Sequence, residues 1–371
     1  MDIDVFKIPL MVLKFNGVWI TKDSSIYYII YSVIMQFLFT YAFTFLMGMY
    51  IIDVTGVLDF ADQSSYFFTY LVCTFKCINI YIQIDDLVDL FDELKDCIDE
   101  FGLDKSYKKH IQQANMFVKF FWVASFTTVF FGGFIPFFSG RLAYPMWFPY
   151  NLDNRFLFYM SVFYQWIGTI CYSAANVMMD MIPVLFMSYF IAMFEHIGDR
   201  LELITKQDEG SEERIDNKKE LLICIKYQQT VIKLVRKIEK MFSFIIFVQG
   251  LFSSIILCMI SFALTMVHLP EDASIFMKLT TYMASMTSQI FIPCFYGTKL
   301  RLTYDRIAVT LFHCDWMYED REFRKIVEFV MENSKTPMRI VAIGFVKIDL
   351  TNFGSICNSA YSLFSVLRRT R

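Results

Sequence analysis

Side chains able to do chemistry are sparse in this sequence, and none forms a recognisable catalytic or metal-binding pattern. The four histidines stand too far apart for metal-ligand spacing; they are His110, His196, His268 and His313. The acidic group of Asp85, Asp86 and Asp89 has the spacing of a solvated helix face, without an apolar cleft around it. Glycine-rich nucleotide motifs and the zinc-protease motif are absent. We therefore predict a protein that is not an enzyme and that uses no metal or cofactor.

Charged side chains inside otherwise apolar stretches are the more informative chemical feature, because hydrocarbon penalises charge. They are Lys76, Lys119, Asp180, Lys347 and Asp349. Asp180 lies deep in an apolar stretch, three residues before Pro183, and must meet a partner, water or a proton. A structural pair or a protonated acid is favoured over a gating role. Lys119, Lys347 and Asp349 fall near the ends of their stretches, where snorkelling to the interface accounts for them.

The elements that position these side chains are apolar enough for lipid. Of 371 residues, 56% are hydrophobic and only 19% are charged. Seven apolar stretches approach or exceed the roughly 20 residues that a helix needs to cross about 30 Å of hydrocarbon. They cover residues 25–52, 64–84, 115–139, 155–194, 241–267, 275–295 and 339–367. The prediction is an all-α polytopic membrane protein with seven transmembrane helices.

The distribution of cations predicts the orientation of these helices. Of the 34 Lys and Arg residues, 24 lie in residues 1–24, 85–114, 195–240 and 297–338, which alternate with segments nearly free of cations. By the positive-inside rule the N-terminus is cytoplasmic and the C-terminus extracellular. Arg368, Arg369 and Arg371 are the exception, on the outside. The net charge of −3 argues against nucleic acid as a partner.

The cytoplasmic segments are predicted to be helical rather than loose. Apolar residues from Leu87 to Phe101 recur with helical spacing before Gly102, which indicates a short helix after the second span. The same period continues without a breaker from Asn217 into the fifth span. We expect residues 195–240 and 297–338 to form a bundle of cytoplasmic anchor helices, with residues 1–371 forming one subunit.

Two further patterns leave alternatives open. Small polar side chains recur every three or four residues in the last span, which suits either a water-filled path or close helix packing. They are Thr351, Ser355, Asn358, Ser359, Ser362 and Ser365. The outer halves of spans two to six are rich in aromatic residues, a composition shared by small-molecule pockets and by interfacial aromatic belts. Composition alone does not choose between these two readings.

The C-terminal quarter of the chain resembles the C-terminal signature of insect odorant receptors. The residues that carry the resemblance are Pro293, Cys294, Phe295, Tyr296 and Gly297, then Trp316, Tyr318, Arg324 and Pro337, and finally Gly344, Phe345, Leu350, Phe353, Tyr361 and Ser362. The resemblance implies an odorant-tuning subunit that assembles with a shared co-receptor into a ligand-gated, non-selective cation channel, a heterotetramer. The lipid membrane would be the plasma membrane of a sensory neuron, crossed by permeating cations.

The resemblance also implies where the sites lie. A small apolar or aromatic volatile odorant would bind among the outer halves of spans two to six, which makes the aromatic cluster the favoured pocket. The expected ligand-binding residues are Phe67, Tyr70, Leu71, Thr74, Phe130, Gly133, Phe137, Tyr164, Gly168 and Tyr172. The last span would line the pore with Tyr361, Phe364 and Arg368, and the alternative face carries Ser355, Ser362 and Ser365.

Two other receptor classes compete with this interpretation. A gustatory receptor would share the architecture, but Trp316 and the Pro293-Cys294 pair argue against it. A metabotropic seven-helix receptor would need the opposite orientation and an outer disulfide. None of the nine cysteines falls in a segment predicted to lie outside.

Overall fold

The computed structural model describes residues 3–103, 107–134, 142, 144–205, 217–267, 273–313, 316–333 and 338–369, and helices dominate these ranges. The elements run in the order η1 (Ile3–Phe6), α1 (Lys7–Phe15), α2 (Ile26–Gln36), η2 (Phe37–Tyr41), α3 (Ala42–Ile52), α4 (Val57–Phe101), α5 (Tyr107–Val129), η3 (Phe130–Phe134), α7 (Arg155–Thr205), α8 (Asn217–Leu264), α9 (Ala273–His313), η4 (Trp316–Tyr318), α10 (Arg321–Asn333), β1 (Val341–Ala342), β2 (Val346–Lys347) and α11 (Leu350–Arg369).

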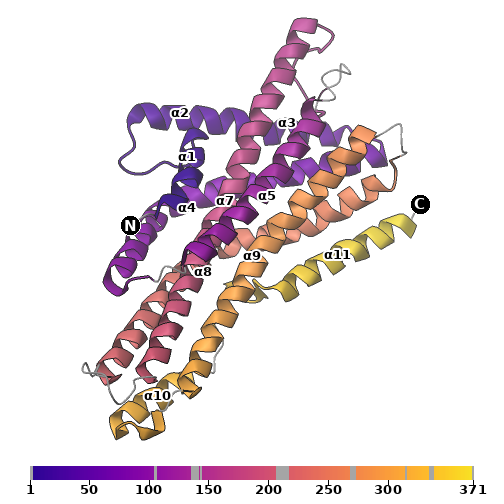
Figure 1. Cartoon of the computed structure of the whole chain (residues 1–371). Helices are drawn as coiled ribbons and strands as arrows, with labels where there is room; N and C mark the ends of the chain where they lie inside the picture. Colours follow the sequence, from indigo (N-terminus) through magenta and orange to yellow (C-terminus); the bar gives the residue numbers. More distant parts are fainter. Residues whose placement is uncertain are drawn as a thin grey trace.

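Three long helices, α7, α8 and α9, run along one another and set the length of the molecule (Figure 1). The 51 residues of α7 extend about 75 Å at 1.5 Å per residue, far more than the thickness of a bilayer. The unbroken helical period predicted this length for α8 and the inner extension of α7. The N-terminal part packs into the same core, where the ring of Phe6 lies 4.8 Å from that of Phe91 and 4.9 Å from that of Phe186.

Five helices of the described residues are long and apolar enough to cross a membrane, judged by length and composition. They cover Ile26–Ile52, Asp59–Phe101, Tyr107–Gly132, Arg155–Ile204 and Asn217–Leu264. Polar side chains dilute the hydropathy of α9 and α11, which hold the predicted sixth and seventh spans. The all-α prediction is confirmed, and seven spans with their orientation stay a prediction.

The second span and the helix expected after it are one element. The helix α4 runs without a break from Val57 to Phe101, because no glycine or proline interrupts it near Ile84. It ends where predicted, at Gly102, whose φ of +76° is a backbone conformation that favours glycine. The short amphipathic helix is therefore the continuation of α4.

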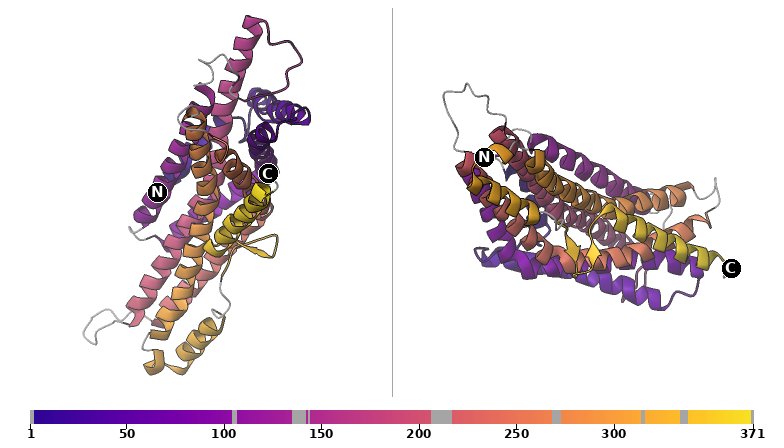
Figure 2. Two further views of the ribbon diagram at one scale, coloured as in Figure 1. Left: turned by 90° about the vertical axis from the view of Figure 1, so that its right-hand side faces the viewer. Right: turned by 90° about the horizontal axis from the view of Figure 1, so that it is seen from below.

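One end of the bundle gathers the ends of α7, α8 and α9 with α10 (Figures 1 and 2), and the end of α4 packs against α8 nearby. Opposite charges join these helices: Lys226 lies 2.5 Å from Glu100, and Lys218 pairs with Glu322. The Tyr227 ring stacks on Phe101 with centroids 4.6 Å apart. This end holds the residues expected to form the anchor bundle.

A half-buried polar cluster joins α5, α7 and α9. His110 Nε2 is 2.5 Å from Glu195 Oε2, and Lys299 Nζ is 3.0 Å from His110 Nδ1. Burial alone would raise the pKa of Glu195, but the hydrogen bond and positive charge of His110, with Lys299 and Arg306 nearby, hold it below the ordinary value of 4.5.

The last apolar stretch is not a single helix from residue 339, as the sequence suggested. Its first residues form a hairpin in which Val341 pairs with Lys347 and Ala342 with Val346. The three-residue loop has positive φ at Ile343 (49°) and Gly344 (77°), and Phe345 N donates to the carbonyl of Ala342 at 3.2 Å. The helix α11 begins only at Leu350, after this turn.

A glycine of α9 lets the hairpin lie close to the bundle. A Cβ on Gly297 would collide with the backbone carbonyl of Ile348. Asp349 then caps α11, since its Oδ1 accepts from Asn352 N at 2.9 Å. The resemblance signature thus contains a residue whose role is close packing.

Candidate functional site

A small cavity lies among α4, α5, α7 and α9, and hydroxyl-bearing side chains supply most of its wall. Its volume is about 60 Å³. We call it the tyrosine cavity, and it is lined by Tyr66, Thr69, Tyr70, Ser125, Thr128, Val129, Tyr144, Thr169, Tyr172, Ser173, Asn176, Tyr282, Ser285 and Met286.

One tyrosine of this wall has an unused hydroxyl. The Tyr66 ring stacks on Tyr282 with centroids 4.9 Å apart and meets Tyr144 edge-on at 5.0 Å. Tyr66 is 4% exposed, and among the described residues its hydroxyl finds no hydrogen-bond partner. Leaving such a group unpaired costs about 1–3 kcal/mol. Tyr66 is therefore a donor and acceptor that a bound molecule can satisfy.

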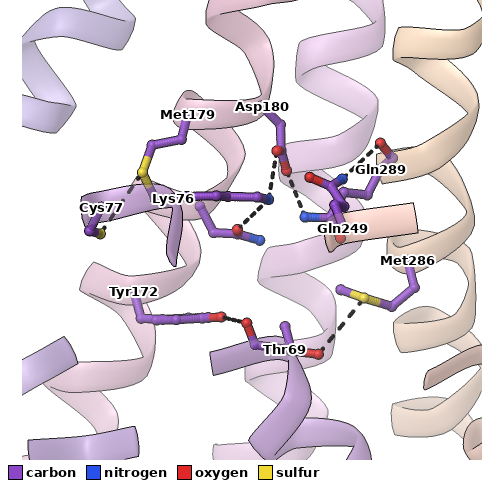
Figure 3. A network of polar contacts seen from close by, with 10 residues as sticks. Thr69, Lys76, Cys77, Tyr172, Met179, Asp180, Gln249, Met286 and Gln289 are labelled. Carbon is purple, nitrogen blue, oxygen red and sulfur yellow. Dashed lines mark hydrogen bonds and ion pairs between the residues drawn. The ribbon is translucent and has the colours of Figure 1, made fainter. Parts of the chain in front are cut away.

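The other tyrosines are held by hydrogen bonds that fix the wall. Tyr282 Oη donates to the carbonyl of Ser65 at 3.0 Å and lies 2.5 Å from Thr69 Oγ1. Tyr172 Oη donates to the carbonyl of Thr69 at 2.5 Å (Figure 3). The Tyr70 and Tyr172 rings stack with centroids 3.7 Å apart. The cavity is thus preformed, with flat aromatic faces.

An ion pair borders the tyrosine cavity. Lys278 Nζ lies 3.0 Å from Asp62 and 5.1 Å from the centre of the Tyr66 ring, within reach of a cation–π interaction. The Lys278 side chain is largely buried. Because the Asp62 carboxylate neutralises the Lys278 ammonium, this ion pair makes the edge of the tyrosine cavity polar without adding net charge.

The structure brings two of the expected ligand-binding residues, Tyr70 and Tyr172, into this cavity. Three others lie on a different face of α4 and line an open groove against α3. These are Phe67, Leu71 and Thr74, and the hydroxyl of Thr74 lies 3.1 Å from that of Thr44. The two faces of α4 differ by one residue of register, about 100° of rotation.

The remaining expected residues are spread more widely. Tyr164 Oη donates to the carbonyl of Leu38 at 2.5 Å, outside the tyrosine cavity. A Cβ at Gly168 would lie 2.8 Å from the Phe43 ring, so this glycine permits close helix packing. Phe130 is partly exposed in η3, the π-helical turn that also contains Gly133. Phe137 lies outside the described residues.

Asp180 has found its partner across the bundle. Lys76 Nζ lies 2.6 Å from Asp180 Oδ1, and the two side chains are 4% and 6% exposed. Gln289 donates to the other carboxylate oxygen at 2.6 Å (Figure 3). Lys76 also donates to Asn176 Oδ1 at 2.9 Å. Asn176 lines the tyrosine cavity, so this polar cluster begins at its wall.

A second cavity, of about 270 Å³, lies between the bundle and α11. We call it the α11 cavity, and it is lined by Lys76, Asn79, Ile80, Met179, Asp180, Pro183, Phe242, Ile245, Ile246, Phe247, Gln249, Gly250, Leu251, Ser254, Gln289, Ile290, Pro293, Cys294, Val346, Ile348, Asn352, Ser355, Ile356 and Ser359. The α11 cavity is larger than the tyrosine cavity, although the aromatic residues of the sequence pointed to the tyrosine cavity.

The two predicted pore faces of α11 have different surroundings. Tyr361 is 70% exposed, and its ring centroid lies 6.3 Å from that of the half-buried Phe364. Ser355 lines the α11 cavity and donates to the carbonyl of Thr351. Ser362 is exposed, and Ser365 donates to the carbonyl of Tyr361 at 2.9 Å. Arg368 lies in the last turn of the helix.

Sequence reasoning missed Tyr66, Tyr144 and Tyr282, which form the aromatic wall of the tyrosine cavity. Tyr66 and Tyr70 are four residues apart, so they share a face of α4 on which Phe67 does not lie. That spacing was a usable signal. No local pattern in the sequence could have placed Tyr144, which Gln165 holds by accepting from its backbone N–H and donating to its carbonyl.

Comparison with known proteins gives one consistent result. The family model described as 7tm Odorant receptor matches residues 56–361. Odorant receptor 59a of Drosophila melanogaster is 23% identical, over 93% of this chain and 91% of its own length. Odorant receptor 2a of the same species is 21% identical, over 94% and 92%.

A solved structure has the same fold. The insect olfactory receptor OR5 from Machilis hrabei, in complex with eugenol, superposes with a TM-score of 0.82 at 14% identity. The match covers 99% of this chain and 98% of that one. With the family model matching most of its length, the chain belongs to the insect odorant receptor family.

Proposed function

We propose that this chain is the odorant-tuning subunit of a ligand-gated, non-selective cation channel. It assembles with the odorant receptor co-receptor, as a tetramer, in the plasma membrane of a sensory neuron. Its seven spans place the N-terminus in the cytoplasm and the C-terminus outside. The odorant binds in the tyrosine cavity, and the channel opens when binding favours an open arrangement of α11.

The unpaired hydroxyl of Tyr66 is the observation that carries this proposal. A preformed cavity with aromatic faces and one unsatisfied polar group suits a small, mostly apolar molecule with a single hydrogen-bonding atom. The solved OR5 of Machilis hrabei is in complex with eugenol, a small aromatic phenol. Dispersion against the rings supplies affinity, and Tyr66 supplies selectivity.

The volume sets the size of the ligand. A water molecule needs roughly 10–15 Å³ of such space, so about 60 Å³ holds on the order of four to six water-sized spheres. A volatile with few heavy atoms fits without rearrangement. A larger aromatic ring requires the wall to move, and Met286 is its most adaptable member.

The exposed face of α11 supports the pore assignment. Tyr361 is 70% exposed, as expected of a residue that meets the axis of an oligomer, although Ser355 and Ser362 of the alternative face are exposed as well. We favour Phe364 as the apolar constriction, because dewetting gates are apolar.

Membrane current tests the channel. Cells expressing this chain with the co-receptor should show odour-evoked cation current, and cells expressing this chain alone should show none. A panel of volatiles then identifies the ligand. Odour responses that need a G protein and carry no cation current would overturn the proposal in favour of a metabotropic receptor.

Replacing Tyr66 with phenylalanine tests the site. The ring remains, so apolar odorants should keep their potency, whereas odorants with a hydrogen-bonding oxygen should lose about 0.5–1.5 kcal/mol, roughly twofold to tenfold. Tyr296→Phe is the matched control, since it removes another buried hydroxyl, outside the cavity, that has no hydrogen-bond partner in the described part of the chain. Equal dose responses of Tyr66→Phe and the unaltered chain for all odorants would move the pocket elsewhere.

A further inference from the structure

The α11 cavity is separate from the proposed odorant site. The two cavities have no lining residue in common, and the hydrogen bond from Lys76 to Asn176 lies between them. At about 270 Å³ the α11 cavity approaches the lower end of ligand pockets, near 300 Å³. It therefore has room for a larger molecule than the tyrosine cavity has.

The walls of the α11 cavity are amphipathic. Most of the lining is apolar, including Phe242, Ile245, Ile246, Ile290 and Ile356. One side is polar and more than nine-tenths buried, where Lys76, Asp180 and Gln249 meet (Figure 3). A cavity with this division matches a molecule that has an apolar body and one polar head.

The polar side has hydrogen-bonding capacity left over. The Lys76 ammonium carries one more N–H donor than its two partners, Asp180 and Asn176, accept within the described residues. Gln249 makes a single long hydrogen bond there, 3.4 Å to the carbonyl of Gln289. Both side chains can donate to an acceptor oxygen in the cavity.

We propose that the α11 cavity is a second ligand site, for a neutral amphiphile with a hydrogen-bond acceptor oxygen, such as a medium-chain alcohol. A charged ligand is disfavoured, because Lys76 and Asp180 already neutralise each other and an added charge would lose its hydration. A pure hydrocarbon leaves the polar donors unpaired.

An occupant of this site touches both the bundle and α11. Gly250 and Ser254 contribute from α8, whereas Asn352, Ser355 and Ile356 contribute from α11. The amphiphile therefore stabilises the arrangement of α11 that keeps the cavity open, and opposes any movement that closes it. Binding itself needs neither an odorant nor a conducting channel, so it stands apart from the proposed function.

Photolabelling tests the site directly. Azioctanol, an alcohol with a photoreactive diazirine, is added to membranes containing the full chain with its co-receptor, and labelled peptides are mapped by mass spectrometry. Label is expected on α8 and α11 at Phe242, Ile246 and Ile356, and excess octanol should remove it. Label confined to the tyrosine cavity, or no label on these residues, would overturn the proposal.

Filling the cavity provides the second arm. A Cβ at Gly250 meets only the terminal methyl of Ile356, at 3.4 Å, so Gly250→Leu projects bulk into the cavity at low steric cost. Labelling should fall to background. Gly354→Leu adds the same bulk to α11 where a Cβ meets no atom within 4 Å, and should keep the label. If Gly250→Leu does not co-purify with the co-receptor, Ser254→Phe fills the cavity instead. Labelling that persists in a folded filling variant refutes the site.

Discussion

The buried pair of Lys76 and Asp180 allows us to predict the order in which single and double variants lose stability. At 2.6 Å and an effective dielectric constant of about 20, the attraction between the charges is about 6 kcal/mol. Desolvation costs several kcal/mol for each ion, so the pair is near balance. Removing one partner leaves the other charge buried without compensation.

Single and double variants should therefore rank in an unusual order. Lys76→Met and Asp180→Leu alone should each destabilise the protein by about 3–5 kcal/mol. The double variant loses only the hydrogen bonds to Asn176 and Gln289, about 1 kcal/mol each, so it should lose about 2 kcal/mol. The double variant is then more stable than either single one.

Thermal unfolding of the detergent-solubilised complex measures this order. The expected Tm values rise from the single variants to the double variant to the unaltered chain. Lys119→Met is the control, because Lys119 is exposed and its removal should change stability by at most about 0.5 kcal/mol. A double variant less stable than both singles, with additive losses, would refute the reasoning that the two charges depend on each other.

Three further predictions concern packing, pH and the pore. Gly297→Ala should cost about 1–3 kcal/mol because its Cβ meets the hairpin backbone, whereas Gly198→Ala, with open space around it, should not lower the Tm; equal Tm values would contradict this. Because the pKa of Glu195 is held below 4.5, its carboxylate stabilises the fold above that pH, and this stabilisation is lost as the pH falls through the lowered pKa. Glu195→Gln should therefore flatten the decline of Tm below pH 4.5. Curves of Tm against pH that run parallel for the variant and the unaltered chain would argue against it. Phe364→Ala should raise the current measured without odorant or alter ion permeation, and ordinary conduction would favour the Ser355 face.

The sequence predicted best what local pattern determines. The helical period continues from Asn217 into the fifth span with no glycine or proline before Gly250, and it predicted the length of α8, whereas Gly102 marked the end of α4. The cost of a charge in lipid implied that Asp180 has a partner. That this partner is Lys76 depends on how α4 and α7 are aligned in space. The residue types at two positions about a hundred residues apart do not predict that alignment.

The candidate site was predicted less completely, for the same reason. The aromatic composition pointed to Tyr70 and Tyr172. Tyr66 was missed because Phe67, one residue and about 100° farther around α4, was chosen instead, and Phe67 lines the groove beside α3 rather than the tyrosine cavity. The hairpin before α11 was missed because a short apolar run suits helix and strand alike. Gly344 was the one residue in that run favouring a turn.

The start of α11 is held to the bundle by hydrogen bonds, so a small tilt there moves its far end by a larger distance. Leu350 N, at the start of the helix, donates to Thr298 of α9 at 2.9 Å, and Ile343 N, in the hairpin before it, donates to Ser243 of α8 at 2.6 Å. From this start the 20 residues of α11 extend about 30 Å. A tilt of roughly 5° at the start then displaces the far end by about 2.6 Å, comparable to the radius of a small ion with part of its hydration shell. A small shift in packing at the hairpin is therefore enlarged at the far end of α11, which in the proposed channel would change the width of the pore.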